Sequence, residues 1–230
     1  MNLTLQSIPS TIITEIFASS DLDGIVLDTE HGYYNNETLV SCVQITTLLK
    51  KKCFVRFADL NKQLIRMCLD AGADGIIFST IEDPIIAKDM IEYCKYPIHG
   101  GKRGSALVRE NKWGREKMSD KKPILVGQIE TKLAVDNIDE LLQCGFDNFV
   151  IGPYDLSSSL GCTADWTNEL YIEYTNKIYN KIPLEKLGAF LPSVKDINMF
   201  HKSGRQRPSI LIWGLDADFI INGINNLNLK

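Results

Sequence analysis

Short apolar runs alternate with helical patterns along most of the chain, and this alternation limits the fold more than any other feature. The runs place Val, Ile, Leu and Phe at consecutive positions, which is typical of strands buried on both faces of a parallel sheet. Between them apolar residues recur three and four positions apart, as at Ile12, Ile13, Ile16 and Phe17. The predicted strands are residues 3–8, 24–28, 53–57, 75–79, 124–129, 148–151, 187–191 and 210–213.

Strands that alternate with helices predict βα units and a parallel sheet. The number of units and the 230 residues fit one (β/α)₈ TIM barrel, so we expect a single domain over residues 1–230. Gly72 and Gly145 are predicted to end helices just before strands. A doubly wound open sheet is the alternative, but no G-x-G-x-x-G motif follows the first strand, which weakens its dinucleotide-binding form.

Charge and cysteine content narrow the class of protein. The net charge is −4 and no basic stripe is evident, so we expect no nucleic-acid partner. The six cysteines form no C-x-x-C pair, which favours free thiols and a cytoplasmic protein. The sequence shows neither a signal-peptide pattern nor an apolar stretch long enough to span a membrane, so we expect no membrane association.

Polar residues follow the predicted strands at their carboxyl ends. In a barrel these ends meet at one rim, where side chains from distant parts of the sequence converge. Ionisable groups at buried strand ends need a partner, a metal ion or a chemical role. The residues collected at this rim are Asp28, Glu30, His31, Arg56, Gln128, Glu130, Gly152, Pro153, Tyr154, Asp155 and Asp216.

Two carboxylates, Glu130 and Asp155, follow neighbouring predicted strands. Together they can share one divalent cation, and oxygen ligands with positions left for water favour Mg²⁺ or Mn²⁺. The alternative is structural: Glu130 would cap the helix that starts at Thr131, and Asp155 would cap the turn before Leu156. We favour the metal site because both residues lie on the same predicted rim.

Arg56 ends an apolar strand, and a guanidinium in that position needs an anion. The anion is either a substrate carboxylate or enolate oxygen, or the acid of a neighbouring strand. His31 lies three residues after Asp28, and a carboxylate at that spacing can hold one imidazole nitrogen and leave the other as a general base. His99 lies in a glycine-rich loop and His201 at a predicted helix end, which are weaker contexts.

Several segments together resemble the HpcH/HpaI aldolase family, the metal-dependent class II pyruvate aldolases of the phosphoenolpyruvate/pyruvate barrel superfamily. They occur in the order found in that family and cover roughly residues 20–165. The segments are DTEHG at 28–32, VR at 55–56, LDAGADGII at 69–77, GKRG at 101–104, W-G at 113–114, QIET at 128–131 and GPYDLSSSLG at 152–161.

The resemblance implies a TIM barrel in a homo-oligomer, often a hexamer built from domain-swapped dimers. It implies a carbon–carbon lyase that cleaves or forms a 4-hydroxy-2-oxoacid, to or from pyruvate and an aldehyde, through a metal-stabilised pyruvate enolate. The aldehyde is expected to be sugar-derived, and the ion to be Mg²⁺ or Mn²⁺, with Co²⁺ or Zn²⁺ as alternatives. The implied residues are Glu130 and Asp155 as metal ligands, His31, Asp28, Arg56 and Asp70 in catalysis, and Arg56, Gln128, Gly152 and Pro153 in substrate binding.

Two other functions remain open. A CoA-ester lyase of the citrate-lyase β-subunit type would share the barrel and the metal carboxylates, but such enzymes usually lack the Glu-His pair seen at Glu30 and His31. A non-catalytic barrel that binds a metabolite is the third reading. The loop after GKRG is shorter than the family's, residues 166–230 match poorly, and residues 202–208 form an unusual basic loop, which leaves the aldehyde side of the site least determined.

Overall fold

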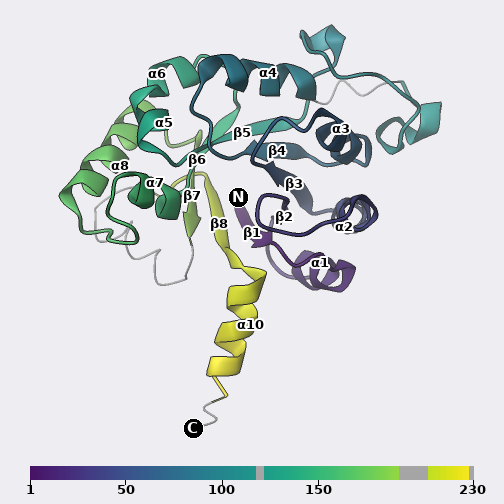
Figure 1. The fold of residues 1–230 in the computed structure, drawn as a ribbon. Coiled ribbons are helices and arrows are strands. Elements are labelled where there is room, and N and C mark those ends of the chain that lie inside the picture. Colours follow the sequence, from purple (N-terminus) through teal and green to yellow (C-terminus); the bar gives the residue numbers. More distant parts are fainter. Residues whose placement is uncertain (118–121, 192–206, 228–230) are drawn as a thin grey trace.

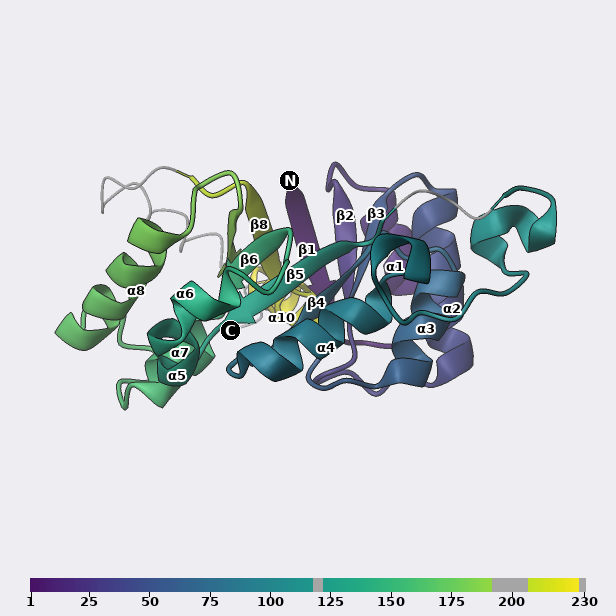
Figure 2. The ribbon, with the colours of Figure 1, turned by 90° about the horizontal axis from the view of Figure 1, so that it is seen from above.

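Eight parallel strands close into a barrel, and helices surround it (Figures 1 and 2). The structure is a computed structural model that describes residues 1–117, 122–191 and 207–227. Each strand pairs with the next along the chain, and the first pairs with the last, so the TIM-barrel prediction is confirmed and the open sheet is wrong. The strands are β1 (Asn2–Gln6), β2 (Gly24–Asp28), β3 (Lys52–Phe57), β4 (Gly75–Phe78), β5 (Ile124–Ile129), β6 (Asn148–Ile151), β7 (Leu187–Leu191) and β8 (Ile210–Leu215).

The helices lie outside the barrel, with α2 and α3 on one side and α7 and α8 on the other (Figures 1 and 2). Most begin at a polar residue whose side chain accepts a backbone N–H, such as Ser10, Asn35 and Asn61. The helices are α1 (Thr11–Ala18), α2 (Asn36–Leu48), α3 (Lys62–Asp70), α4 (Pro84–Cys94), α5 (Lys132–Asp136), α6 (Ile138–Leu141), α7 (Pro153–Ser159), α8 (Glu169–Lys181) and α10 (Asp216–Asn225), with 3₁₀ helices η1 (Pro97–His99) and η2 (Arg109–Gly114).

The predicted strands differ from the observed ones mainly at the ends of the first and last. The first was expected to reach residue 8, but β1 ends at Gln6. The N–H groups of Ser7 and Ile8 donate to the carboxylate of Asp216 instead of to a neighbouring strand. The predicted helix end at Gly72 is confirmed, because Gly72 follows the C-cap of α3 with a φ of 104°. The helix before Gly145 ends earlier than predicted, at Leu141, and Gly145 lies in the turn before β6 with a φ of 102°.

Apolar side chains pack in two layers around the strands. The larger cluster fills the space between the barrel and the helices and includes the residues at the helix stripes. A second cluster fills the inside of the barrel. Its buried members are Leu3, Leu5, Val26, Phe54, Ile77, Val126, Val150, Ile210 and Ile212. The barrel is therefore a packed core with no channel through this cluster, as expected for the fold.

The last described helix, α10, leaves the barrel instead of lying along it (Figure 1). Phe219 near its start meets Phe17 of α1 in an edge-to-face contact, with ring centroids 5.9 Å apart. Further along, Ile221, Ile224 and Leu227 are 54%, 54% and 63% exposed. This helix carries an apolar surface that nothing in the described chain covers.

Two loops singled out in the sequence are partly described. The stretch 96–122 contains η1 and η2, and its η2 part stands at the outer edge of the molecule beyond α3 (Figure 2). In the basic loop 202–208, residues 202–206 lie outside the described residues, as does His201. Arg207 is described; its guanidinium donates to the side chain of Asn2 at 2.5 Å and stands 6.0 Å from the ring of Trp213.

Candidate active site

The site is a polar tier of side chains that lies directly above the apolar tier inside the barrel. Alternate residues of a strand point to the same face, so each strand delivers its rim residue two positions after an inward apolar one. The apolar tier contains Val26, Phe54, Ile77, Val126 and Val150. The polar tier contains Asp28, Arg56, Ser79, Gln128 and Gly152, with Glu130 two positions beyond Gln128.

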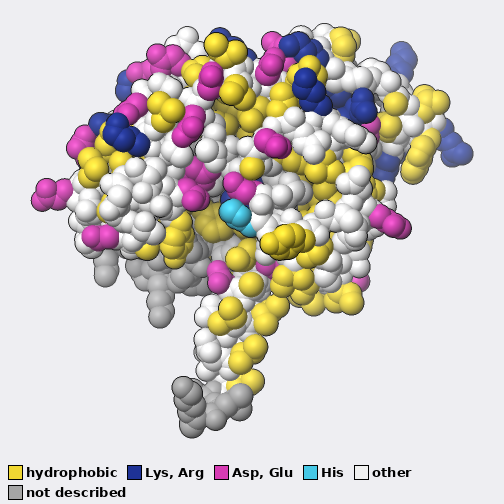
Figure 3. Space-filling view, in the orientation of Figure 1, with side chains coloured by type: hydrophobic (Ala, Val, Ile, Leu, Met, Phe, Trp, Pro, Cys, Tyr) yellow, Lys and Arg dark blue, Asp and Glu magenta, His cyan; other side chains and the backbone are white. Residues whose placement is uncertain are grey.

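The face that Figure 3 presents is hollowed near its centre, and acidic side chains and a histidine gather there, above the start of α10. This agrees with the rim predicted from the strand ends. The structure therefore brings together residues that lie far apart in the sequence, such as Arg56 and Glu130, whose charges interact.

Asp28 and Arg56 form a buried bidentate ion pair. The strand register places them side by side, and Nε and Nη2 of Arg56 lie 2.9 and 2.8 Å from the two oxygens of Asp28. Nη1 of Arg56 lies 3.2 Å from Oε2 of Glu30. Burial alone lowers the pKa of Arg56, but the hydrogen bonds to Asp28 and the charge of Glu30 outweigh it and raise that pKa. Of the two anions predicted for Arg56, a substrate oxygen or the acid of a neighbouring strand, the structure contains the second.

His31 lies at the exposed edge of the tier. The Asp28 oxygens are occupied by Arg56 and by the backbone N–H of Glu30, which donates at 3.1 Å. Within the described residues, no hydrogen bond joins Asp28 to His31. The two side chains are close in sequence, but the structure does not pair them, and the roles expected of them stay predictions.

Glu130 is almost fully buried, at 2% exposure. Its Oε1 accepts from the N–H and the hydroxyl of Thr80, at 2.6 and 2.9 Å, and its Oε2 accepts from the side-chain amide of Gln128. Burial raises the pKa of Glu130 to about 7, and the charges of Glu30 and Asp155 act in the same direction against the hydrogen bonds from Thr80. A bound cation would offset this concentration of negative charge.

Gly152 leaves the space that Glu130 and Gln128 need. A Cβ atom at this position would lie 2.4 Å from Oε2 of Glu130 and 2.7 Å from Nε2 of Gln128. Gly152 also precedes α7, whose first residue is Pro153 and whose first turn carries the exposed Asp155. Only glycine allows the start of α7 to approach Glu130 this closely.

The capping alternatives for the two carboxylates are wrong. Thr131 caps α5, because its hydroxyl accepts the N–H of Ala134 at 3.1 Å, whereas Glu130 points to Thr80 and Gln128. Asp155 lies inside the first turn of α7 and makes no capping hydrogen bond among the described residues.

Ser79 and Thr80 belong to the site but were not among the residues collected from the sequence. The hydroxyl of Ser79 donates to Oε1 of Glu30 at 2.9 Å, and Thr80 holds Glu130. They follow β4, the strand between β3 and β5, and thereby link the Arg56 group to the Glu130 group. Their position in the sequence could have identified them, because two successive hydroxyl residues at the end of a predicted strand lie on the same rim as the other site residues.

Asp216 lies at the rim but serves the fold. Its carboxylate accepts from the N–H and hydroxyl of Ser7 and from the N–H of Ile8, so it ties the start of α10 to the end of β1. At 1% exposure it is as buried as Asp28.

Asp70 does not lie at the rim of its own chain. It ends α3, and helices of a βα barrel run opposite to the strands, so Asp70 lies at the other end of the barrel. There it accepts from Nη2 of Arg103 at 2.7 Å, and the same nitrogen donates to Glu110 at 2.8 Å. Any catalytic role for Asp70 would therefore concern a site other than that of its own barrel.

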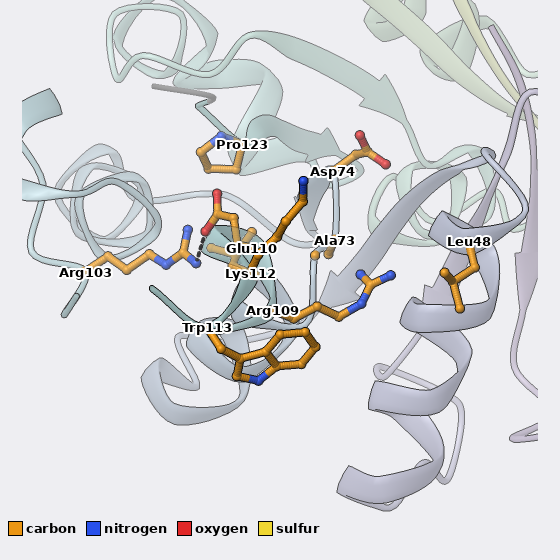
Figure 4. A pocket seen from close by; sticks show the side chains of 11 residues that line it. Leu48, Ala73, Asp74, Arg103, Arg109, Glu110, Lys112, Trp113 and Pro123 are labelled. Atoms are coloured by element: carbon orange, nitrogen blue, oxygen red, sulfur yellow. Dashed lines mark hydrogen bonds and ion pairs between the residues drawn. The ribbon is translucent and has the colours of Figure 1, made fainter. Parts of the chain in front are cut away.

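A cavity of about 570 Å³ lies next to this Arg103 cluster (Figure 4). Leu48, Arg109 and Trp113 are among its lining residues. Arg103 is paired with Glu110, and Arg109 donates to the backbone carbonyl of Ala71 at 2.7 Å. The charges around this cavity are largely engaged within the protein.

The described residues contain no group of three or more His, Cys, Asp or Glu side chains arranged to hold a metal ion. The donor set of the rim still suits a hard divalent cation, because Glu130 and Asp155 offer oxygens only and Glu30 adds charge nearby. Such a site needs two protein ligands when water or substrate oxygens supply the others.

A comparison of sequences decides the family. The sequence profile described as HpcH/HpaI aldolase/citrate lyase matches residues 7–223. The chain belongs to the HpcH/HpaI aldolase/citrate lyase family. The family expected from the motifs is thereby confirmed.

Members of the HpcH/HpaI family are similar to this chain in sequence and in structure. A 2-keto-3-deoxy-L-rhamnonate aldolase of Escherichia coli O17:K52:H18 is 32% identical over 159 residues, which cover 66% of this chain and 59% of that protein. The chain thus aligns with less than two thirds of this relative's length. A family protein from Burkholderia cenocepacia J2315 has the same fold, with a TM-score of 0.86 at 20% identity over 99% of this chain and 92% of its own.

The structure of citrate synthase SbnG is also similar, with a TM-score of 0.82 and 25% identity. The match covers 98% of this chain and 90% of that one. Within the described residues of this HpcH/HpaI family member, no helix is long and apolar enough to cross a membrane.

Proposed function

We propose that the protein is a divalent-metal-dependent aldolase that cleaves or forms a 4-hydroxy-2-oxoacid, to or from pyruvate and an aldehyde. The observation that carries this proposal is the buried carboxylate of Glu130 on the same tier as the Arg56 guanidinium. The similarity to 2-keto-3-deoxy-L-rhamnonate aldolase supports the reaction type and a sugar-derived oxoacid.

Glu130 and Asp155 would hold the ion, which we take to be Mg²⁺ or Mn²⁺, with Co²⁺ or Zn²⁺ as alternatives. When bound, the ion supplies Lewis-acid chemistry toward the carboxylate and keto oxygens of pyruvate. Gln128 orients Glu130 through its amide, and Gly152 leaves room for both side chains.

Arg56 supplies positive charge where the enolate oxygen develops. The bidentate pair with Asp28 fixes the plane of the guanidinium before substrate binds. A fixed charge of this kind stabilises the transition state without reorganising during the reaction. Asp28 thus acts in this proposal by orienting Arg56.

His31 is proposed as the group that moves the proton at the aldehyde end. It is exposed at the edge of the tier, where a substrate would extend out of the barrel. A neutral imidazole in water can accept a proton near neutral pH. During cleavage it would take the proton of the 4-hydroxyl group as the carbon–carbon bond breaks and the electron pair moves to the enolate.

The test is exchange of the pyruvate methyl protons in deuterated water, followed by NMR, with Mn²⁺ or Mg²⁺ and with EDTA. We expect exchange that requires the metal and that Glu130→Gln abolishes. Glu140→Gln, at an exposed acid of α6, is the matched control and should exchange like the wild type. Absence of exchange with every divalent ion would refute the aldolase.

A second candidate is a citrate-forming enzyme, which the similarity to citrate synthase SbnG favours. Such a reaction joins an acetyl group to a 2-oxoacid and would use a thioester instead of an aldehyde. Formation of citrate from acetyl-CoA and oxaloacetate, without pyruvate proton exchange, would select this candidate or the related CoA-ester lyase. Ligand binding without either reaction would select a non-catalytic barrel.

We further propose a homo-oligomer, a hexamer or trimer of dimers, in which a second copy covers α10. The apolar residues Ile221 and Ile224 at 54% exposure support this, since such patches mark interaction sites. Light scattering after gel filtration should give a multiple of the 25.9 kDa chain mass. The double variant Ile221→Asp, Ile224→Asp should reduce the mass, and Ile172→Asp on α8 should not; a monomeric wild type would refute the oligomer.

We also propose a cytoplasmic location, because all six cysteines are free thiols and five of them are buried. The single domain over residues 1–230 is likewise proposed, on the ground that one barrel uses strands from β1 to β8.

A further inference from the structure

Thr80 has an unusual backbone conformation for its residue type. Its φ angle is +51°, in the left-handed region, which a β-branched residue rarely adopts. Such a conformation is costly and persists only where the surroundings require it. In this structure Thr80 contacts the carboxylate of Glu130.

Both donors of Thr80 converge on one atom. Its N–H lies 2.6 Å and its hydroxyl 2.9 Å from Oε1 of Glu130. The φ angle of Thr80 sets the direction of its side chain relative to its N–H, and at +51° the hydroxyl and the N–H reach the same oxygen. A residue in the usual β conformation would continue the strand direction of β4 and would not present this pair of donors.

The other oxygen of Glu130 has fewer protein partners. Among the described contacts Oε2 accepts one hydrogen bond, from the amide of Gln128, whereas Oε1 accepts two. With Oε1 bonded twice, rotation of the carboxylate would break two hydrogen bonds to a charged group.

Ser79, the preceding residue, binds the other acid, Glu30. Its hydroxyl donates to Oε1 of Glu30 at 2.9 Å, and Glu30 in turn contacts Arg56. The Ser79–Thr80 step thus lies between the two acids and binds one with each residue.

We infer that Thr80 is a positioning residue, which fixes Glu130 so that Oε2 is the oxygen presented to the divalent ion. This inference rests on the proposed function, in which Glu130 is a metal ligand. Partners of metal-ligating carboxylates set the orientation of the ligand, and their loss typically weakens metal affinity by roughly 10- to 100-fold.

The test measures Mn²⁺ affinity of the metal-free protein by titration calorimetry for four variants. Thr80→Ser keeps both donors and should bind Mn²⁺ like the wild type. Thr80→Val keeps the shape and the N–H but loses the hydroxyl, and should bind roughly tenfold more weakly or worse. Thr80→Gly loses the hydroxyl and relieves the backbone strain. It should therefore weaken Mn²⁺ binding, and its melting temperature should not fall. Thr163→Val, at an exposed threonine, is the control.

If Thr80 only shaped the turn, its substitution would leave the Mn²⁺ affinity unchanged. Val and Gly variants that bind Mn²⁺ as tightly as the wild type, while Glu130→Gln binds weakly, would overturn the role of Thr80 and leave the proposed function intact. A wild-type protein that binds no Mn²⁺ would overturn both. Should Thr80→Val not fold, the comparison of Thr80→Ser with Thr80→Gly decides the matter.

Discussion

Gly152 shows how small a change at a single residue would disturb the site. A methyl group there would meet Oε2 of Glu130 at 2.4 Å, so either α7 or Glu130 would have to move. We predict that Gly152→Ala lowers the rate of pyruvate proton exchange by roughly 100-fold, because displacing a reacting group by about 1 Å has an effect of that size. Gly223→Ala, where an added Cβ meets nothing within 4 Å, is the matched control. An unchanged exchange rate in Gly152→Ala would contradict the site geometry.

The buried Glu130 also predicts how the stability of the metal-free protein depends on pH. Its folded pKa of about 7 lies above the ordinary 4.5, so the folded protein binds the proton more tightly than the unfolded chain. The stabilisation is fully present below pH 4.5 and is lost as pH rises toward 7. Its size is on the order of 3 to 4 kcal/mol, since the two pKa values differ by about 2.5 and one pKa unit corresponds to roughly 1.4 kcal/mol.

Urea unfolding in EDTA at pH 5 and pH 7 measures this effect. The wild type should lose free energy of unfolding between these values, and Glu130→Gln, which cannot titrate, should lose less. Glu140→Gln is the control and should follow the wild type. Equal losses in wild type and Glu130→Gln would show that another group causes the dependence.

Sequence reasoning placed most of the site on the rim because strand ends and charged residues are visible in the sequence. It anticipated the ion pair of Arg56 as one of two readings. It did not anticipate Thr80, whose importance comes from a backbone angle that no residue pattern in this chain announces. That Asp28 pairs with Arg56 and not with His31 likewise depends on side-chain packing across β2 and β3.

Among the secondary-structure elements, α10 depends on one buried acid for its attachment. Asp216 accepts three hydrogen bonds from Ser7 and Ile8 at the end of β1. We predict that Asp216→Asn lowers the free energy of unfolding by about 1–3 kcal/mol, because the amide replaces one acceptor by a donor in a buried position. Asp218→Asn, in the same helical turn, changes the charge equally and should have little effect. Denaturant unfolding would reveal the difference, and equal effects would assign it to helix charge alone.

The strands were predictable because their apolar residues are consecutive and bounded by Gly, Asp or Lys. The direction in which α10 leaves the barrel was not predictable, since the sequence of an apolar helix face does not identify the surface that covers it. The same holds for η2, where Lys112 and Trp113 both adopt left-handed conformations. Neither residue type favours that conformation, so local sequence gives no warning of the turn.

Binding of the proposed ion should raise the stability of the whole molecule. A ligand that binds only the folded state stabilises it by about 2.7 kcal/mol at a hundredfold excess over its dissociation constant. We therefore predict that Mn²⁺ raises the melting temperature of the wild type in a concentration-dependent way and that EDTA reverses the rise. Glu130→Gln should show a much smaller rise and Glu140→Gln the full one. A melting temperature that does not change with Mn²⁺ would contradict a metal site in the folded protein.

The apolar tier under Gln128 and Glu130 closes the barrel from below, so the site is a well with a single opening. A molecule bound at the bottom of such a well is covered by whatever binds after it. Pyruvate would then enter before the aldehyde and leave after it. In the proposed aldolase, the order in which the two reactants bind and leave would therefore follow from the apolar tier of Val26, Phe54, Ile77, Val126 and Val150 that closes the bottom of the well.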